Sequence, residues 1–281
     1  MKIDIKKEEQ LMLIAKKSRI ITLKMIFLAQ SGHSGSSLGL AEILVCLYFN
    51  IMNINPENPN WGERDRLILS KGHACPILYT MLALRGYFTI GNLRSLRRIN
   101  SILQGHPDLK KTPGIDMTTG SLGAGLSIGV GMALSAKLDK KDYKVFVIMG
   151  DGEINEGTVW EAAMAANKFK LNNLIGILER NHLQLDGNTE EIMPLEPLNK
   201  KWLAFNWDVI EIDGHNVSQI IMSLNKAKKS KNKPTLIISH TIKGKGVSFM
   251  ENRCEWHGKV PDAKELKQAI YELKEINGKI K

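Results

Sequence analysis

The sequence predicts an α/β protein with a mostly parallel sheet and helices on both of its faces. Short apolar runs, most of them rich in β-branched residues, alternate along the chain with longer segments of helical periodicity. Most of these runs are apolar almost throughout, as expected of strands that are buried on both faces. Several end in a glycine-containing turn that carries a polar side chain, which is where parallel sheets bind ligands.

The chain has 281 residues, which is enough to bury a sizeable core. It contains no internal repeat and no linker rich in proline or serine, so we expect a single domain over residues 1–281. An amphipathic helix is predicted at about residues 8–30, and a surface helix at about 261–276 closes the chain.

The composition limits the cellular setting. Cys46, Cys75 and Cys254 are widely spaced and include no CxxC pair, which indicates a reducing cytoplasm and no structural zinc. The N-terminus is charged and is not typical of a signal peptide. The most apolar segment, 38–52, is too short to span a bilayer and is predicted to be a buried helix. We therefore expect a cytoplasmic protein without a membrane partner.

The formal net charge of +10 would attract acidic partners. The densest basic run, 226–233, has no interleaved aromatic residues on which nucleic-acid bases could stack. It is better explained as a solvated connection between a helix and a strand, so we expect no nucleic-acid partner.

Histidines beside glycine recur in the predicted loops of the first half. His33 lies in a seven-residue stretch of Gly and Ser that cannot pack a core. His73 follows a predicted strand at 64–70, just before Pro76 starts a helix, and a helix N-terminus favours anions. His106 lies in a third such turn. Histidine can both bind a phosphate or hydroxyl and move protons near neutral pH.

A glycine-rich segment at 118–126 opens the next predicted helix, 122–138. It lacks the lysine of a P-loop and only loosely follows the dinucleotide-binding spacing. Gly129 and Gly131 are better explained by close packing of the helix. Gly120, Ser121 and Leu122, at the start of the helix, remain candidates for contact with a cofactor.

The centre of the chain carries the strongest signal for a metal. A strand at 144–149 ends at Gly150, Asp151 and Gly152, a helix follows at 156–169, and the next strand, 174–178, ends just before Asn181. If the two strands are parallel neighbours, a carboxylate, an amide oxygen and a backbone carbonyl meet at one edge of the sheet. Such ligands suit Mg²⁺. The alternative is an ordinary strand-to-helix turn.

The last third of the chain continues the alternation. Strands are predicted at 208–212 and 235–239, with a helix at 217–228 between them. Lys243 lies just beyond the last strand, where it could meet a phosphate. His257 is a fourth histidine beside glycine.

Seven motifs, in this order, resemble the thiamine diphosphate-binding half of transketolase. They are GHSG at 32–35, LSKGHAC at 69–75, QGHPD at 104–108, TGSLGAGLS at 119–127, GDGEINEG at 150–157, RNHLQLDG at 180–187, and KGKGVSFMEN at 243–252 with WHGK at 256–259. The resemblance runs from about residue 8 to 261.

The resemblance implies a role for each matching residue. Asp151, Asn181 and the Leu183 carbonyl would bind Mg²⁺, for which Ca²⁺ or Mn²⁺ could substitute. The remaining contacts with thiamine diphosphate would come from His73, Gly120, Ser121, Leu122, Gly152, Glu156, Asn181, Lys243 and His257. His33, His106 and His257 would face the sugar and shuttle its protons. Glu156, with Glu161, would lie at the subunit contact that connects paired active sites.

The resemblance also implies an activity and a partner. Transketolases transfer a two-carbon ketol unit between sugar phosphates, as in the pentose phosphate pathway. Full-length members continue into a pyrimidine-binding domain and a C-terminal domain, which this sequence does not include. We therefore expect a partner subunit that carries those domains, self-association across a two-fold axis, and a heterotetramer of two such pairs.

Three positions depart from the family pattern. Ser34 replaces a proline, Glu179 replaces an aspartate, and His182 stands where glycine or lysine is usual. These departures leave the substrate preference and the loop geometry open. Two alternatives to a transketolase of standard substrates are considered. One is a related enzyme with another donor or acceptor sugar, and the other is a non-catalytic regulatory subunit that keeps the fold.

Overall fold

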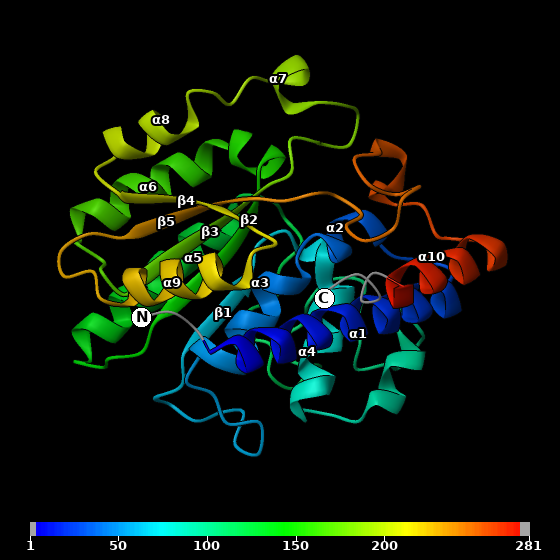
Figure 1. Cartoon of the computed structure of the whole chain (residues 1–281). Coiled ribbons are helices and arrows are strands. Elements are labelled where there is room, and N and C mark those ends of the chain that lie inside the picture. The colour runs from blue at the N-terminus through cyan, green and yellow to red at the C-terminus, as the bar shows by residue number, and fades with distance from the viewer. Residues whose placement is uncertain (1–3, 276–281) are drawn as a thin grey trace.

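The computed structural model describes residues 4–275 and contains one five-stranded sheet (Figure 1). The strands lie in the order β1, β2, β3, β5, β4, and every neighbouring pair is parallel. Their bounds are β1 Arg66–Leu69, β2 Val145–Gly150, β3 Leu174–Arg180, β4 Asp208–Asp213 and β5 Thr235–His240. All five predicted strands and the predicted parallel sheet are confirmed.

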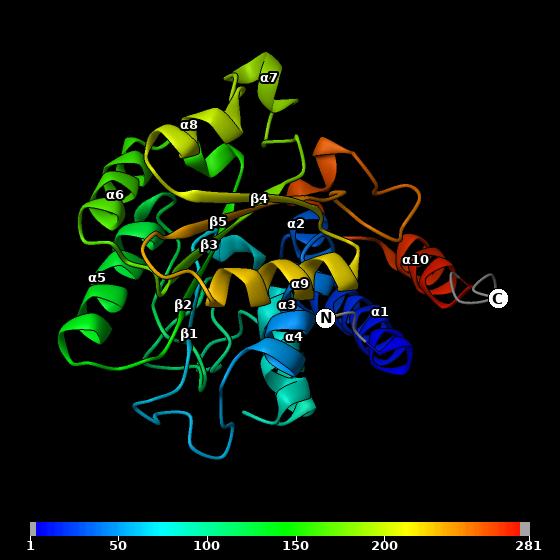
Figure 2. The same ribbon diagram turned by 60° about the vertical axis from the view of Figure 1, so that its left-hand side comes forward.

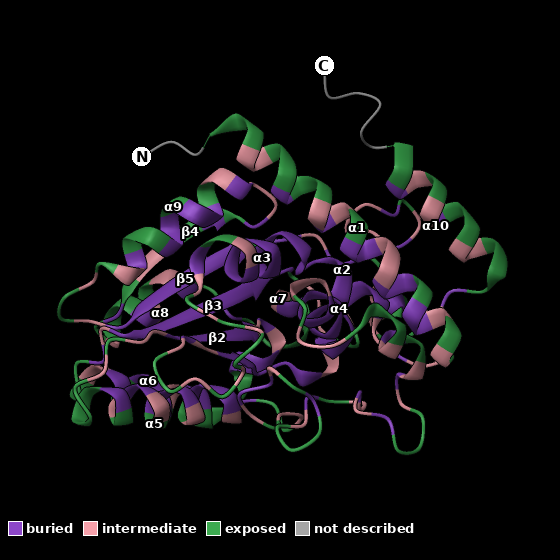
Figure 3. Cartoon of the chain, turned by 90° about the horizontal axis from the view of Figure 1, so that it is seen from below, coloured by how far each residue is buried: buried purple, intermediate pink, exposed green. Residues whose placement is uncertain are grey.

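Helices cover both faces of the sheet, as predicted (Figure 2). One face carries α1 Ile5–Ala29, α3 Ala41–Cys46, α4 Cys75–Arg85 and α9 Val217–Lys228, and the other carries α5 Ala124–Leu138, α6 Gly157–Lys168 and α8 Leu198–Ala204. On β2, Phe146 and Ile148 pack on the first face, whereas Val145, Val147 and Met149 pack on the second. Because successive strand residues point to opposite faces, an apolar residue is needed at nearly every position. Strands β1, β2, β3 and β5 are accordingly almost completely buried (Figure 3), whereas the edge strand β4 is mostly exposed or half-buried.

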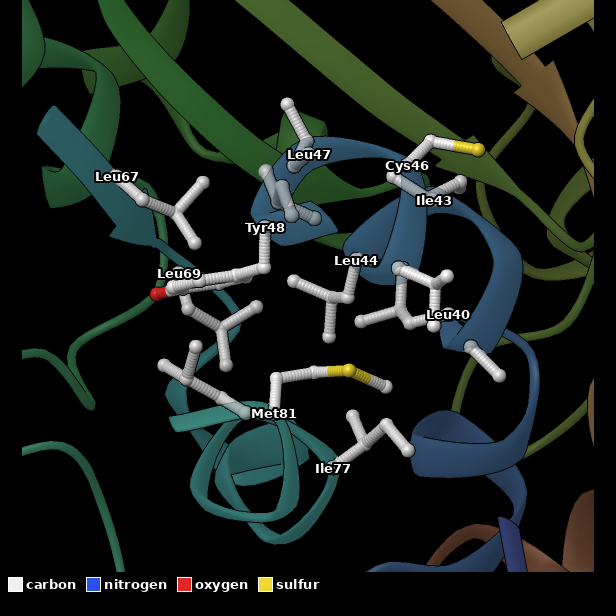
Figure 4. Packing of buried hydrophobic residues seen from close by; sticks show 14 of the residues in the cluster. Leu40, Ile43, Leu44, Cys46, Leu47, Tyr48, Leu67, Leu69, Ile77 and Met81 are labelled. Carbon is white, nitrogen blue, oxygen red and sulfur yellow. The ribbon is translucent and has the colours of Figure 1, made fainter. Parts of the chain in front are cut away.

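The core of the first face lies between α3, α4 and the end of the sheet at β1. Leu40, Ile43 and Leu44 of the α3 region meet Ile77 and Met81 of α4 (Figure 4). Leu67 and Leu69 of β1 complete the cluster. This packing fixes the start of α4, and with it the turn that carries His73.

A smaller cluster lies beside the sheet layers. The helix α10, Ala263–Glu275, packs along α1, where Ala269 and Leu273 join Leu23, Leu38 and Trp256 in one buried group. The predicted closing helix is therefore confirmed over its described part, and residue 276 lies outside the described residues. No helix within residues 4–275 combines the length and the apolar character needed to cross a membrane.

The apolar segment 38–52 differs from the single helix that we predicted. It divides into the end of α2 Ser34–Leu38, the helix α3, and a π-helical turn η1 Leu47–Ile51. The break falls at Gly39, where a Cβ would lie 2.5 Å from the Glu179 carboxylate. Glu42 of α3 is also buried, and Arg19 of α1 donates to its two oxygens at 2.5 and 2.6 Å.

Several short elements had no counterpart in the sequence prediction. They are η2 Gly72–Ala74, η3 Ile90–Ser95, η4 Gly152–Asn155, α7 Thr189–Ile192, α8, and η5 Cys254–His257. These elements have three to seven residues and are too short to show a hydrophobic period. Most of them lie in the loops that surround the candidate site.

Candidate active site

The loops at the carboxyl ends of the parallel strands enclose a cavity of about 220 Å³. Residues Gly150 and Glu179, at the ends of β2 and β3, are direct neighbours in the sheet register. Eight of the residues predicted from the sequence line the cavity: His73, Leu122, Asp151, Gly152, Asn181, Leu183, Lys243 and His257. The structure therefore brings together side chains from five motifs at the edge where parallel sheets bind ligands.

Asp151 is buried and directed at the turn after β3. One of its carboxylate oxygens accepts from the Gly152 amide at 2.8 Å, and the other accepts from the His182 amide at 2.7 Å. The side-chain oxygen of Asn181 accepts from the Leu183 amide at 3.0 Å. A carboxylate, an amide oxygen and a backbone carbonyl thus lie on adjoining turns, and this donor set fits a hard divalent cation such as Mg²⁺.

Arg180, which the sequence analysis missed, lies behind the carboxylate. Its guanidinium is fully buried and lies 3.3 Å from Asp151, 2.9 Å from Glu190 and 3.2 Å from Glu196. It also donates to the Thr189 hydroxyl at 2.6 Å. Burial raises the pKa of Asp151, and Arg180 opposes that shift. Arg180 thus connects the predicted metal ligand to the segment around α7.

Two buried lysines supply positive charge to the cavity. Lys71 forms an ion pair with Glu179, and both side chains are almost completely buried. Lys243 lies 3.4 Å from the Nδ1 atom of His257. Burial and the charge of Lys71 lower the pKa of Lys243. A bound anion would relieve this electrostatic cost, so the cavity fits a diphosphate.

The backbone at Gly152 leaves room for such a group. A Cβ there would lie 3.0 Å from the Cβ of Gln184, so the two turns approach closely only because position 152 is glycine. The amide nitrogen of the Gln184 side chain is buried, and no hydrogen-bond partner for it lies within residues 4–275. A bound phosphate could accept from it.

Three of the four predicted histidines form a tight cluster. The ring centroids of His33, His73 and His257 are 5.0 to 5.3 Å apart. Burial and the nearby cations Arg97 and Lys71 lower the pKa of His33 to about 4, and burial and Lys243 lower that of His257 to about 4. Burial and Lys71 also lower the pKa of His73 strongly. All three are therefore neutral at pH 7 and can accept protons.

His106 lies beside this cluster, in an exposed position. A Cβ at Gly120 would lie 3.3 Å from its ring, and Gly120 has a φ of +151° that favours glycine. Burial and Arg97 lower its pKa. Gly120 and Ser121 thus lie near the site without lining the cavity, as does His33.

Glu153 is a second residue that the sequence analysis missed. Its carboxylate is buried and accepts from the Ser70 hydroxyl, from the Gly123 amide at 2.9 Å and from the Gly150 amide at 3.0 Å. It therefore connects the end of β1, the start of α5 and the end of β2. All three donors point at one acid, so this side chain positions the turns that carry the predicted cofactor contacts.

Glu156 lies outside the cavity. It is exposed and precedes α6, and Glu161 is exposed on the same helix. Cys75 is completely buried, and burial raises its pKa to about 12, so its thiol is not reactive at neutral pH. The described residues include no group of three or more His, Cys, Asp or Glu side chains placed to hold a metal.

Comparison with known proteins gives the family. A family model described as the thiamine diphosphate binding domain of transketolase matches residues 11–275. The chain belongs to the transketolase family. The resemblance seen in the seven motifs is thereby confirmed.

Two similar proteins, each named as one subunit of a transketolase, have nearly the same length as this transketolase-family chain. The subunit of apulose-4-phosphate transketolase from Phocaeicola vulgatus is 45% identical over 267 residues, which cover 95% of each chain. The 6-deoxy-6-sulfo-D-fructose transketolase subunit SqwG of a Clostridium species is 49% identical over 255 residues, covering 91% of this chain and 93% of the other.

Single-chain transketolases match over only part of their length. Human transketolase is 39% identical over 260 residues, which are 92% of this chain but 41% of the human protein. The crystal structure of the Campylobacter jejuni transketolase superposes with a TM-score of 0.90 at 33% identity, covering 97% of this chain and 43% of that one. The chain therefore spans about two fifths of a single-chain transketolase.

Proposed function

We propose that this chain is the thiamine diphosphate-binding subunit of a two-chain transketolase and that, with its partner, it transfers a two-carbon ketol unit from a ketose phosphate to an aldose phosphate. The observation that carries the proposal is the cluster of His33, His73 and His257 at 5.0 to 5.3 Å, beside the buried Lys243 and Asp151. Proton acceptors, a cationic pocket and the carboxylate predicted to bind the metal lie close together.

The cofactor-binding residues follow from the cavity. Asp151, Asn181 and the Leu183 carbonyl would hold Mg²⁺, or Ca²⁺ or Mn²⁺ in its place, and Gly152 and Lys243 would lie at the diphosphate. His73, Gly120, Ser121 and Leu122 would contact the rest of the cofactor. Thiamine diphosphate supplies the electron sink for cleavage of the bond beside a carbonyl.

The proton transfers of the reaction would fall to the chain's own histidines. His33, His106 and His257 would hold and move protons of sugar hydroxyls, and the lowered pKa values of all three keep them neutral and able to accept. Glu156 would lie at the subunit contact that connects paired active sites and would contribute there to cofactor binding and catalysis.

A second chain completes the proposal. Relatives of this length are named as subunits, and single-chain transketolases are much longer. Apolar side chains are exposed on α6 and beyond its end, where Met164 and Phe169 are 54% and 43% accessible, and Leu138 at the end of α5 is 73% accessible. Such an apolar surface favours association. We propose that residues 1–281 form one domain that self-associates and joins the partner in a cytoplasmic heterotetramer.

A second candidate function keeps the chemistry and changes the sugar. It is favoured because the two relatives of similar length carry the names of apulose 4-phosphate and 6-deoxy-6-sulfo-D-fructose. A donor panel of xylulose 5-phosphate and these two sugars tests the choice in the assembled complex. We expect xylulose 5-phosphate, a donor of the pentose phosphate pathway, to give the highest kcat/KM. A higher value for either of the other donors would reassign the substrate and leave the ketol transfer intact.

A further inference from the structure

Arg97 connects the two loops that carry His33 and His106. Its Nη1 atom donates to the Ser31 hydroxyl at 2.7 Å, and its Nη2 atom donates to the Gly105 carbonyl at 3.1 Å. Ser31 lies two residues before His33, and Gly105 directly precedes His106. One guanidinium therefore spans segments that are more than 70 residues apart in the sequence.

The surroundings of Arg97 hold its side chain in this position. A Cβ at Gly105 would lie 3.2 Å from the Nε atom, so the guanidinium packs directly against the glycine backbone. The Arg97 amide donates to the Leu103 carbonyl at 2.9 Å. The backbone of Arg97 has a φ of +59°, a left-handed conformation that a non-glycine residue adopts only when its surroundings enforce it.

The His106 loop is fixed from its other side as well. The Tyr79 hydroxyl lies 3.0 Å from the Gln104 carbonyl and 2.9 Å from the His106 carbonyl. Arg97 is thus the contact that relates this loop to the loop of His33. The Nε atom is buried, and both terminal nitrogens are already engaged with protein oxygens. Arg97 is also not among the residues that line the cavity, so its side chain acts through the two loops that it contacts.

We propose that Arg97 is a positioning residue that ties the His33 loop to the His106 loop and thereby sets the placement of the two histidines that face the sugar. The inference rests on the proposed ketol transfer, because that reaction gives these histidines their role. It adds to that function a residue whose removal should affect the sugar steps and leave cofactor binding unchanged.

The charge of Arg97 has a second consequence. Burial lowers the pKa of His33 most, followed by Arg97, His106, Lys71 and Lys243, so every charged group that acts on this ring acts in the same direction. Burial and Arg97 lower the pKa of His106. Removing the guanidinium should therefore raise the pKa values of His33 and His106. As the pH falls, both histidines would then become protonated, and stop accepting protons, at a higher pH than in the wild type.

The test uses Arg97→Gln and Arg97→Lys in the assembled complex, with Arg98→Gln as the matched control on an exposed neighbouring arginine. We expect Arg97→Gln to lower kcat/KM for the sugar by about 10- to 100-fold, since small misplacements of reacting groups cost that much. In the pH profile of Arg97→Gln, the fall of kcat/KM on the acidic side should occur at a higher pH than in the wild type. Arg97→Lys keeps the charge and loses the two-point contact, so its rate should fall while its acidic limb stays in place. Arg98→Gln should match the wild type.

A second readout does not depend on activity. Histidine NMR titration of the full chain, assigned with His33→Gln and His106→Gln, should show raised pKa values of His33 and His106 in Arg97→Gln and unchanged values in Arg98→Gln. Thermal unfolding establishes that each variant is folded. Unchanged titrations together with wild-type kcat/KM in folded Arg97→Gln would overturn the inference. A wild-type complex that transfers no ketol unit would instead contradict the proposed function, and the titrations would still decide whether Arg97 controls both histidines.

Discussion

Replacing Asp151 by asparagine should weaken the binding of thiamine diphosphate with Mg²⁺ by about 100-fold or more. Even groups that only support metal ligands are worth about 10- to 100-fold in affinity, and Asp151 is the carboxylate of the proposed metal site. The substitution keeps the side-chain volume and removes the charge. Arg180 would keep its hydrogen bond to Thr189 and its ion pairs with Glu190 and Glu196. We therefore expect the fold to persist.

Titration calorimetry of the cofactor in the presence of Mg²⁺ measures this effect. Asp186→Asn is the control, because Asp186 is an exposed aspartate on the neighbouring turn. Equal cofactor affinities of Asp151→Asn and the wild type would mean that the metal is bound elsewhere.

Replacing Glu179 by glutamine should lower the free energy of unfolding by about 3–5 kcal/mol, the usual cost of leaving a buried charge without its partner. Glu179 is completely buried, pairs with Lys71, and is 3.3 Å from the Asn181 side-chain nitrogen. Without the Glu179 charge, the positive charge of Lys71 would be unpaired beside that of Lys243. Their repulsion would lower the free energy of unfolding further. Denaturant unfolding measures the difference between variant and wild type.

The same experiment with cofactor present separates a structural role from a role in the site. Because a bound diphosphate would offset the charge of Lys71, saturation with thiamine diphosphate and Mg²⁺ should recover part of the lost stability. Glu265→Gln breaks an exposed ion pair with Lys259 and should cost about 1 kcal/mol or less. An equally small effect of Glu179→Gln would show that the buried pair does not stabilise the empty site.

The sequence was sufficient to predict the parallel sheet and the ends of its strands. Runs such as 145–149 and 174–178 must be apolar on both faces, and Asp151 and Asn181 come two and three residues after their ends. Parallel pairing then places both residues at one edge, and the register of β2 with β3 agrees with that expectation.

The residues missed by the sequence analysis depend on contacts across the chain. Lys71 and Glu179 are 108 positions apart, and neither stands in a local pattern that reveals the other. Arg180 follows an apolar strand, where a charged residue looks like the strand's exposed end, although it is fully buried among acids. Glu153 lies within the GDGEINEG motif, yet two of its three donors, Ser70 and Gly123, come from distant parts of the sequence. Burial of a charged group requires partners, and sequence patterns do not identify distant partners.

The most direct test of the proposed function is ketol transfer from xylulose 5-phosphate to ribose 5-phosphate, with thiamine diphosphate and Mg²⁺. It should be measured with this chain alone, with the partner chain alone, and with the two mixed. We expect transfer only in the mixture, because the pyrimidine-binding and C-terminal domains would come from the partner. Full activity of this chain alone would contradict the proposal that it is one half of a two-chain enzyme.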